Sequence, residues 1–158
     1  MLKSFLISSF FLVSQLPNPD PEFTQLKTQL ESYGFEVNIA IPPDFTIPRY
    51  NPDLRRSFQR SLGLFRDRSI WINPIVFELD FSKQTLIHEA VHAVQSCVGE
   101  GQVEPIGLDI EPIPQALPHF KRYADSQTQD LEREAYTVQS QPNSYQLVRS
   151  LLDLHCKK

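Results

Sequence analysis

The chain has little glycine, 5 of its 158 residues against 13 prolines, which predicts rigid connections rather than flexible linkers. It has one methionine. Its two cysteines are too few to build a cysteine metal site. It also lacks a basic patch, and with a formal net charge of -4 we expect no nucleic-acid partner. Its length and its hydrophobic content of 41% predict one globular domain with a substantial core.

The N-terminal segment has no hydrophobic run long enough for a stable membrane span. Residues 1–14 carry one positive charge, on Lys3, followed by a short apolar stretch, whereas a transmembrane helix needs about 20 apolar residues. The pattern is typical of a secretory signal peptide, although a small-x-small cleavage site is missing. We expect residues 1–16 to be either this signal or an apolar helix, and residues 17–158 to form the single domain. Export to the periplasm or the medium is favoured, with a cytoplasmic location as the alternative.

The two cysteines, Cys97 and Cys156, leave two possibilities open. In an exported protein they can form a disulfide, which would close a loop of about 60 residues. Alternatively, both are buried free thiols. The sequence favours neither.

Only four histidines are present, and two of them stand in the sequence His88-Glu89-Ala90-Val91-His92. Residues four apart on a helix lie one above the other, so both imidazoles can direct a nitrogen at one ion. Glu89 projects about 100° around the helix from His88, where it can take a proton from a water but cannot easily be a ligand. This is the spacing of zinc metallopeptidases. The alternative is a pair of core histidines bonded to backbone carbonyls.

This motif lies in a predicted helix from Lys83 to Val98, with Ser82 as its N-cap and Gly99 as its end. Apolar residues recur at helical spacing along it: Leu86, Ala90, Ala93, Val94 and Cys97. A helix this apolar lies inside the protein. Burying two imidazoles and a carboxylate without partners would be unfavourable, and a metal ion removes that penalty.

The rest of the chain predicts an α+β fold, a short antiparallel sheet or hairpin packed on the motif helix and on C-terminal helices. A helix over 22–33 ends at Gly34, a strand over 35–41 follows, and 44–59 is an exposed loop. Strands at 61–65 and 69–73 flank a tight turn and form the hairpin. After an irregular stretch over 102–118 and a short helical segment at 119–123, helices are expected over 127–139 and 144–155.

Two histidines leave a catalytic zinc short of one protein ligand. The segment Glu132-Arg133-Glu134-Ala135 follows on the helix predicted over 127–139. With this segment and the His-Glu-x-x-His motif, the chain resembles the gluzincins, the thermolysin-like metallopeptidases, in a small single-domain form similar to the minigluzincins. In that family a glutamate on a later helix completes the site, often as E-x-x-A or E-x-E-A followed by Asp or Asn. The resemblance covers roughly residues 61–139.

The third ligand is a choice between two glutamates that lie about 200° apart around the helix, so only one can bind. Alignment on Ala135 gives Glu132, whereas Glu134 lies on the apolar side of the helix. We predict Glu132, with Glu134 as the alternative, and His119 as a further candidate. Tyr136 occupies the position where the family has Asp or Asn, so either Tyr136 supports a zinc-bound histidine or the support comes from elsewhere.

The resemblance implies a zinc-dependent metallopeptidase that cleaves a peptide or protein substrate with Glu89 as general base. An extended substrate would then lie as an added strand against one strand of the hairpin. Tyr123, Tyr136 and His119 are candidates for the donor to the oxyanion. The alternative is a non-catalytic zinc-binding domain that acts as a sensor or interaction module, although such a domain has no need of Glu89.

Overall fold

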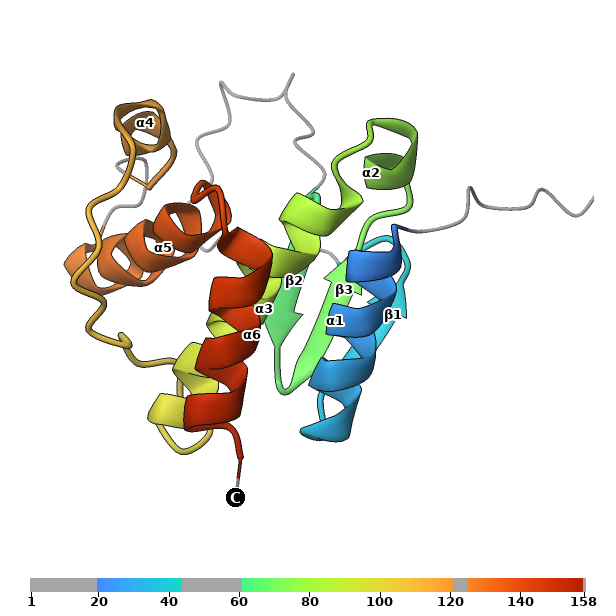
Figure 1. The fold of residues 1–158 in the computed structure, drawn as a ribbon, viewed down its shortest axis with the longest axis horizontal. Coiled ribbons are helices and arrows are strands. Elements are labelled where there is room, and N and C mark those ends of the chain that lie inside the picture. The colour runs from blue at the N-terminus through green and yellow to red at the C-terminus, as the bar shows by residue number, and fades with distance from the viewer. Residues whose placement is uncertain (1–19, 44–60, 121–124, 158) are drawn as a thin grey trace, which may run out of the picture.

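The computed structural model describes residues 20–43, 61–120 and 125–157, without the side chains of residues 119 and 120. It shows helices and one small sheet in an α+β arrangement, as predicted (Figure 1). The possible signal segment over 1–16 and the loop expected over 44–59 lie outside the described residues.

Helix α1, Pro21–Ser32, starts where the sequence supplies a cap. Asp20 accepts a hydrogen bond from the backbone N–H of Glu22 at 2.7 Å, and proline occupies the first helical position. The helix buries Phe23, Leu26 and Leu30, the face predicted from their spacing. It ends just before Gly34, whose φ of +81° turns the chain into the first strand.

The sheet has three strands in the order β1-β3-β2. The predicted hairpin is confirmed: β2, Gly63–Arg66, pairs antiparallel with β3, Ser69–Ile72. Asp67 and Arg68 both have positive φ, as a two-residue turn of this hand requires. Strand β1, Glu36–Ile39, is shorter than predicted and pairs parallel with β3, so the sheet is mixed rather than purely antiparallel.

Helix α3, Ser82–Val98, lies between the sheet on one side and two C-terminal helices on the other (Figure 1). Cys97 and Val98 at its C-terminal end are half-buried, whereas six of its apolar residues are fully buried: Leu86, Ile87, Ala90, Val91, Ala93 and Val94. The prediction of Ser82 as N-cap was wrong by one residue. A short helix that the sequence did not predict, α2 (Ile75–Glu78), precedes α3, and the N–H of Phe81 bonds to Val76 O at 2.8 Å. Phe81 is the N-cap of α3, because its carbonyl accepts a bond from Thr85 N at 3.1 Å.

The C-terminal half follows the prediction closely. After an irregular stretch come a 3-10 turn, Pro114–Ala116, and α4, Leu117–Phe120; the remainder of the helical segment expected over 119–123 lies outside the described residues. Helix α5, Ser126–Gln139, is capped by Asp125, which accepts from Thr128 N at 2.7 Å. Helix α6, Ser144–His155, has the predicted bounds.

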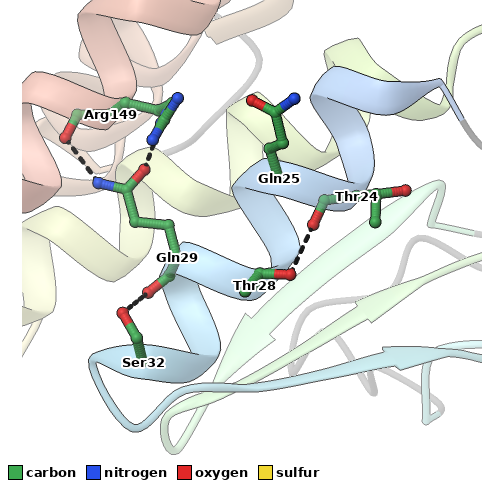
Figure 2. Close-up of a pocket in the computed structure, with 6 residues that line it drawn as sticks. All are labelled: Thr24, Gln25, Thr28, Gln29, Ser32 and Arg149. Carbon is green, nitrogen blue, oxygen red and sulfur yellow. Dashed lines mark hydrogen bonds between the residues drawn. The ribbon is translucent and has the colours of Figure 1, made fainter.

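Polar contacts join α6 to α1, the two helices farthest apart in sequence. Gln29 Nε2 donates to Arg149 O at 3.1 Å, and Arg149 Nε donates to Gln29 Oε1 at 2.7 Å (Figure 2). These bonds border a hollow lined by polar residues: Thr24, Gln25, Thr28, Gln29, Ser32 and Arg149. Thr28 and Ser32 there donate to backbone carbonyls of their own helix, so the hollow is explained by helix packing.

A disulfide joins Cys97 to Cys156, with their Cα atoms 5.2 Å apart. It resolves the choice that the sequence left open, and it fastens the C-terminal end of α3 to the end of α6. Disulfides are typical of oxidising compartments, in agreement with the expected export. Within the described part of the chain, no helix is long and apolar enough to cross a membrane.

We predict that replacing both cysteines, Cys97→Ala with Cys156→Ala, lowers the free energy of unfolding by roughly 3–4 kcal/mol, because the bridge constrains a long loop of the unfolded chain. Urea unfolding measures the change. The reduced wild type is the matched control and should unfold as the double variant does. Equal midpoints for the oxidised wild type and the double variant would contradict the prediction.

Candidate metal centre

Side chains from two helices converge beside the middle of α3. His88 and His92 come from consecutive turns of α3, and Glu132 comes from α5. One ligand atom from each lies within 4.8 Å of the other two, and His88 Nε2 and His92 Nε2 are 3.2 Å and 3.5 Å from the two carboxylate oxygens. All three side chains are largely shielded from solvent. Among the described residues, this is the group that could hold a metal ion.

The chemistry of the group fits a metal. Two imidazole nitrogens and a carboxylate oxygen suit zinc and other first-row metals. Glu132 Oε2 is buried and has no hydrogen-bond partner within the described residues, although His88 Nε2 lies close to it. A buried carboxylate oxygen without a donor is unfavourable, and a cation between it and the imidazoles would satisfy it.

The same closeness shifts the pKa values of the metal-free group. Burial lowers the pKa of His92, but the hydrogen bond and attraction to Glu132 outweigh it and raise that pKa to about 9. Burial raises the pKa of Glu132, but the closeness of the His88 and His92 imidazoles outweighs it and holds the pKa well below its usual range. Without a metal, a proton held between these groups takes the place of the cation.

Glu89 lies next to the ligand group but faces the sheet. It is 6% exposed, and burial is the main cause that raises its pKa. A Cβ added at Gly63 of β2 would lie 2.5 Å from Glu89 Oε1, and the backbone of Phe65 bonds to the carboxylate. The carboxylate therefore fits into a space that exists because residue 63 has no side chain.

The outer nitrogens of both histidines have glutamine partners. His88 Nδ1 lies 3.1 Å from Gln139 Oε1, and His92 Nδ1 lies 2.7 Å from Gln95 Oε1. Tyr136 packs its ring against His88, with the ring centroids 4.6 Å apart. Gln139, seven residues after Glu132, is therefore the hydrogen-bond partner of the outer nitrogen of His88. Sequence reasoning missed both glutamines. For Gln95 the available signal was its position three residues after His92 on the same helix.

Glu134, the alternative ligand, is turned away from the histidines. It is 2% exposed, and its carboxylate accepts bonds from Gln95 and from the backbone N–H groups of residues 106–108. The structure thus brings Glu132, and not Glu134, to the imidazoles. The side chain of His119, the other candidate ligand, lies outside the described residues.

No family model, no curated protein and no solved structure matches this chain.

We predict that the metal-free protein loses stability as the pH rises from about 6.5 to about 9. The pKa of His92 is raised from 6.5 to about 9, so the folded state keeps a proton that the unfolded state releases. Its stabilising effect is complete below about pH 6.5 and is lost as the pH passes about 9, which amounts to roughly 1–3 kcal/mol. Urea unfolding of chelator-treated protein across this range measures it.

The matched control is Glu132→Gln, which removes the charged partner of His92 and should flatten the pH dependence. Saturating zinc should also remove the loss, because zinc competes with the proton for the imidazole. A stability of the metal-free wild type that stays level or rises over this range would contradict the prediction.

Proposed function

We propose that this chain is an exported zinc-dependent metallopeptidase in which His88, His92 and Glu132 bind the metal and Glu89 is the general base. The observation that carries the proposal is the meeting of a carboxylate from α5 with both imidazoles of the His-Glu-x-x-His helix. This is the arrangement that the resemblance to gluzincins implies. The position of Glu89 beside the group supports hydrolysis over metal storage.

The chemistry divides among the residues as follows. Zinc held by His88, His92 and Glu132 would supply Lewis acidity, which would lower the pKa of a water and polarise the carbonyl under attack. Glu89 accepts the proton of the attacking water and returns it to the leaving amine. Its raised pKa, caused by burial, brings it closer to working pH, where a base can both take and give a proton. Gln139 and Gln95 hold the imidazoles in place.

The open edge of β2 supports binding of the substrate as an added strand. Of the two hairpin strands considered from the sequence, β3 is paired on both sides and has no free edge, whereas β2 ends the described sheet. Asn73 N donates to Leu62 O at 2.9 Å, so alternate residues of β2, Gly63 and Phe65, direct their backbone groups outward. The Glu89 carboxylate lies next to this outward edge. One carbonyl of the edge, Gly63 O, already accepts a hydrogen bond from Ser61 Oγ.

A donor for the oxyanion is part of the proposal. Of the three candidates, Tyr136 has a described side chain, and its ring packs against His88. The side chains of Tyr123 and His119 lie outside the described residues. Tyr136→Phe, which keeps the ring and removes the hydroxyl, is the variant that separates packing from donation.

The first test measures zinc content and peptide cleavage together. We expect the wild type to bind one zinc per chain and to cut a peptide library, and Glu89→Gln to keep the zinc while the rate falls roughly 100-fold or more, because the base is gone. Atomic spectroscopy gives the metal and mass spectrometry gives the products. His88→Ala is the matched control, because it should lose both.

Two outcomes would count against this function. A wild type that binds zinc stoichiometrically but cuts no peptide would favour the alternative, a non-catalytic sensor or interaction domain. Cleavage that survives Glu89→Gln at the full rate would exclude the assigned role of Glu89.

A second test uses the close contact between the sheet and the base. Gly63→Ala places a methyl group 2.5 Å from Glu89 Oε1, so the carboxylate must shift. We expect the rate of cleavage to fall roughly 10–100-fold, as it does for a displaced catalytic group, with zinc content and melting temperature near those of the wild type. Unchanged cleavage would mean that this contact does not set the position of the base.

A further inference from the structure

The buried carboxylate of Glu134 is saturated with hydrogen-bond donors. It accepts from Ile106 N at 2.8 Å, from Gly107 N at 2.7 Å and from Leu108 N at 3.2 Å. A positive φ of +81° at Gly107 lets these successive N–H groups face the same way. The fourth donor is the side-chain amide of Gln95, at 3.0 Å. Glu134 is thus an internal anion that accepts bonds on both oxygens.

The orientation of the Gln95 amide follows from its neighbours. Gln95 is fully buried, and its Nε2 lies 3.0 Å from both Glu134 Oε2 and the backbone oxygen of Leu131. An ionised carboxylate and a carbonyl oxygen can only accept, so both require the NH₂ end of the amide. Oε1 must then face His92, whose Nδ1 is 2.7 Å away.

We propose that Glu134 is a positioning residue that acts through Gln95 to fix the proton of His92 on Nδ1. An amide oxygen accepts and cannot donate, so in the neutral imidazole, the form that binds a metal, Nδ1 has to carry the hydrogen and Nε2 is left with its lone pair. Nε2 is the nitrogen that lies 3.5 Å from Glu132 and belongs to the candidate ligand group. This inference rests on the metal site of the proposed function but not on peptide hydrolysis.

The same carboxylate has a second contact that must be separated from this effect. By binding residues 106–108 it also anchors the irregular stretch before α4 to α5. A variant that simply loosens this stretch would weaken the site indirectly. The test therefore has to change the direction of the hydrogen bonds and not only their number.

The first variant is Glu134→Gln, measured by competition of the protein with a chromophoric chelator for zinc. A glutamine at 134 can present a donor to Gln95 Oε1, and the Gln95 amide can then turn its Nε2 towards His92 with the loss of its bond to Leu131 O. We expect zinc affinity to fall roughly 10–100-fold, the usual range for partners of a liganding histidine. The matched control is Asp130→Asn, an exposed carboxylate on the same helix, which should leave zinc affinity unchanged.

The decisive variant exchanges the two side chains, Gln95→Glu with Glu134→Gln. A carboxylate at 95 accepts from His92 Nδ1, and the amide at 134 donates to that carboxylate. The hydrogen bonds from residue 134 through residue 95 to His92 (the relay) then keep a direction that fixes the proton on Nδ1, although Leu131 O loses the donor that Gln95 supplied. We expect the exchange to recover part of the zinc affinity that Glu134→Gln loses. If anchoring residues 106–108 were the only role of Glu134, the exchange would bind zinc no better than the single variant.

A spectroscopic measurement reports the proton directly. In wild-type protein with ¹⁵N-labelled histidine and loaded with ¹¹³Cd, we expect His92 to show metal coupling at Nε2 and a protonated Nδ1. In Glu134→Gln, part of that signal should shift or broaden. Should Glu134→Gln not fold, Gln95→Met is the second variant. It removes the hydrogen bonds from Glu134 through Gln95 to His92 but keeps those from residues 106–108 to Glu134, and we expect it to lose zinc affinity to the same extent.

The outcomes separate this inference from the proposed function. Zinc binding that is equally tight in the wild type, Glu134→Gln and Gln95→Met would overturn the relay and leave the peptidase standing. Variants that lose zinc as expected in a protein that cuts no peptide would overturn the peptidase and leave the relay standing. A wild type that binds no metal would overturn both.

Discussion

The contact between α3 and α5 is the interaction on which the site depends, because it places a largely shielded carboxylate against two largely shielded imidazoles. Neither helix can bury these groups alone, since an isolated buried charge is strongly unfavourable. Glu132 lies 3.2 Å from His88 and 3.5 Å from His92, and one of its oxygens has no hydrogen-bond donor within the described residues. The packing of α3 against α5 therefore requires a cation or a proton between the carboxylate and the imidazoles.

The rest of the fold holds α3 in place from every side. The sheet and α1 cover it on one side, α5 and α6 on the other, and the disulfide fixes its end to the end of α6. A coordination site tolerates little displacement of its ligands, and rigid elements with packed surroundings maintain such geometry better than loops do. The apolar stripe of α3 is thus as much part of the site as the histidines are, because it fixes where they point.

The sequence predicts those features that depend on local spacing. The pair His88 and His92, the hairpin with its tight turn, and the bounds of α6 all follow from periods and turn residues that a short window contains. The parallel pairing of β1, the helix α2 and the Gln139 partner of His88 depend on contacts between distant parts of the chain. Gln139 is 51 positions from His88, and no periodicity within either helix specifies that they meet. The disulfide, 59 positions apart, was undetermined for the same reason.

The two glutamates of α5 show why the apolar side of a helix was a poor guide to the third ligand. Reasoning from burial correctly placed Glu134 inside the protein, where it is 2% exposed. Burial alone does not make a ligand, however, because a carboxylate that accepts from three backbone N–H groups and an amide is already satisfied. Glu132 is less deeply buried, yet it has the oxygen without a donor and the imidazoles beside it. A metal ligand such as Glu132 differs from a structural acid such as Glu134 in lacking hydrogen-bond donors. The backbone donors that satisfy Glu134 come from residues 106–108, and no helical pattern connects these residues to α5.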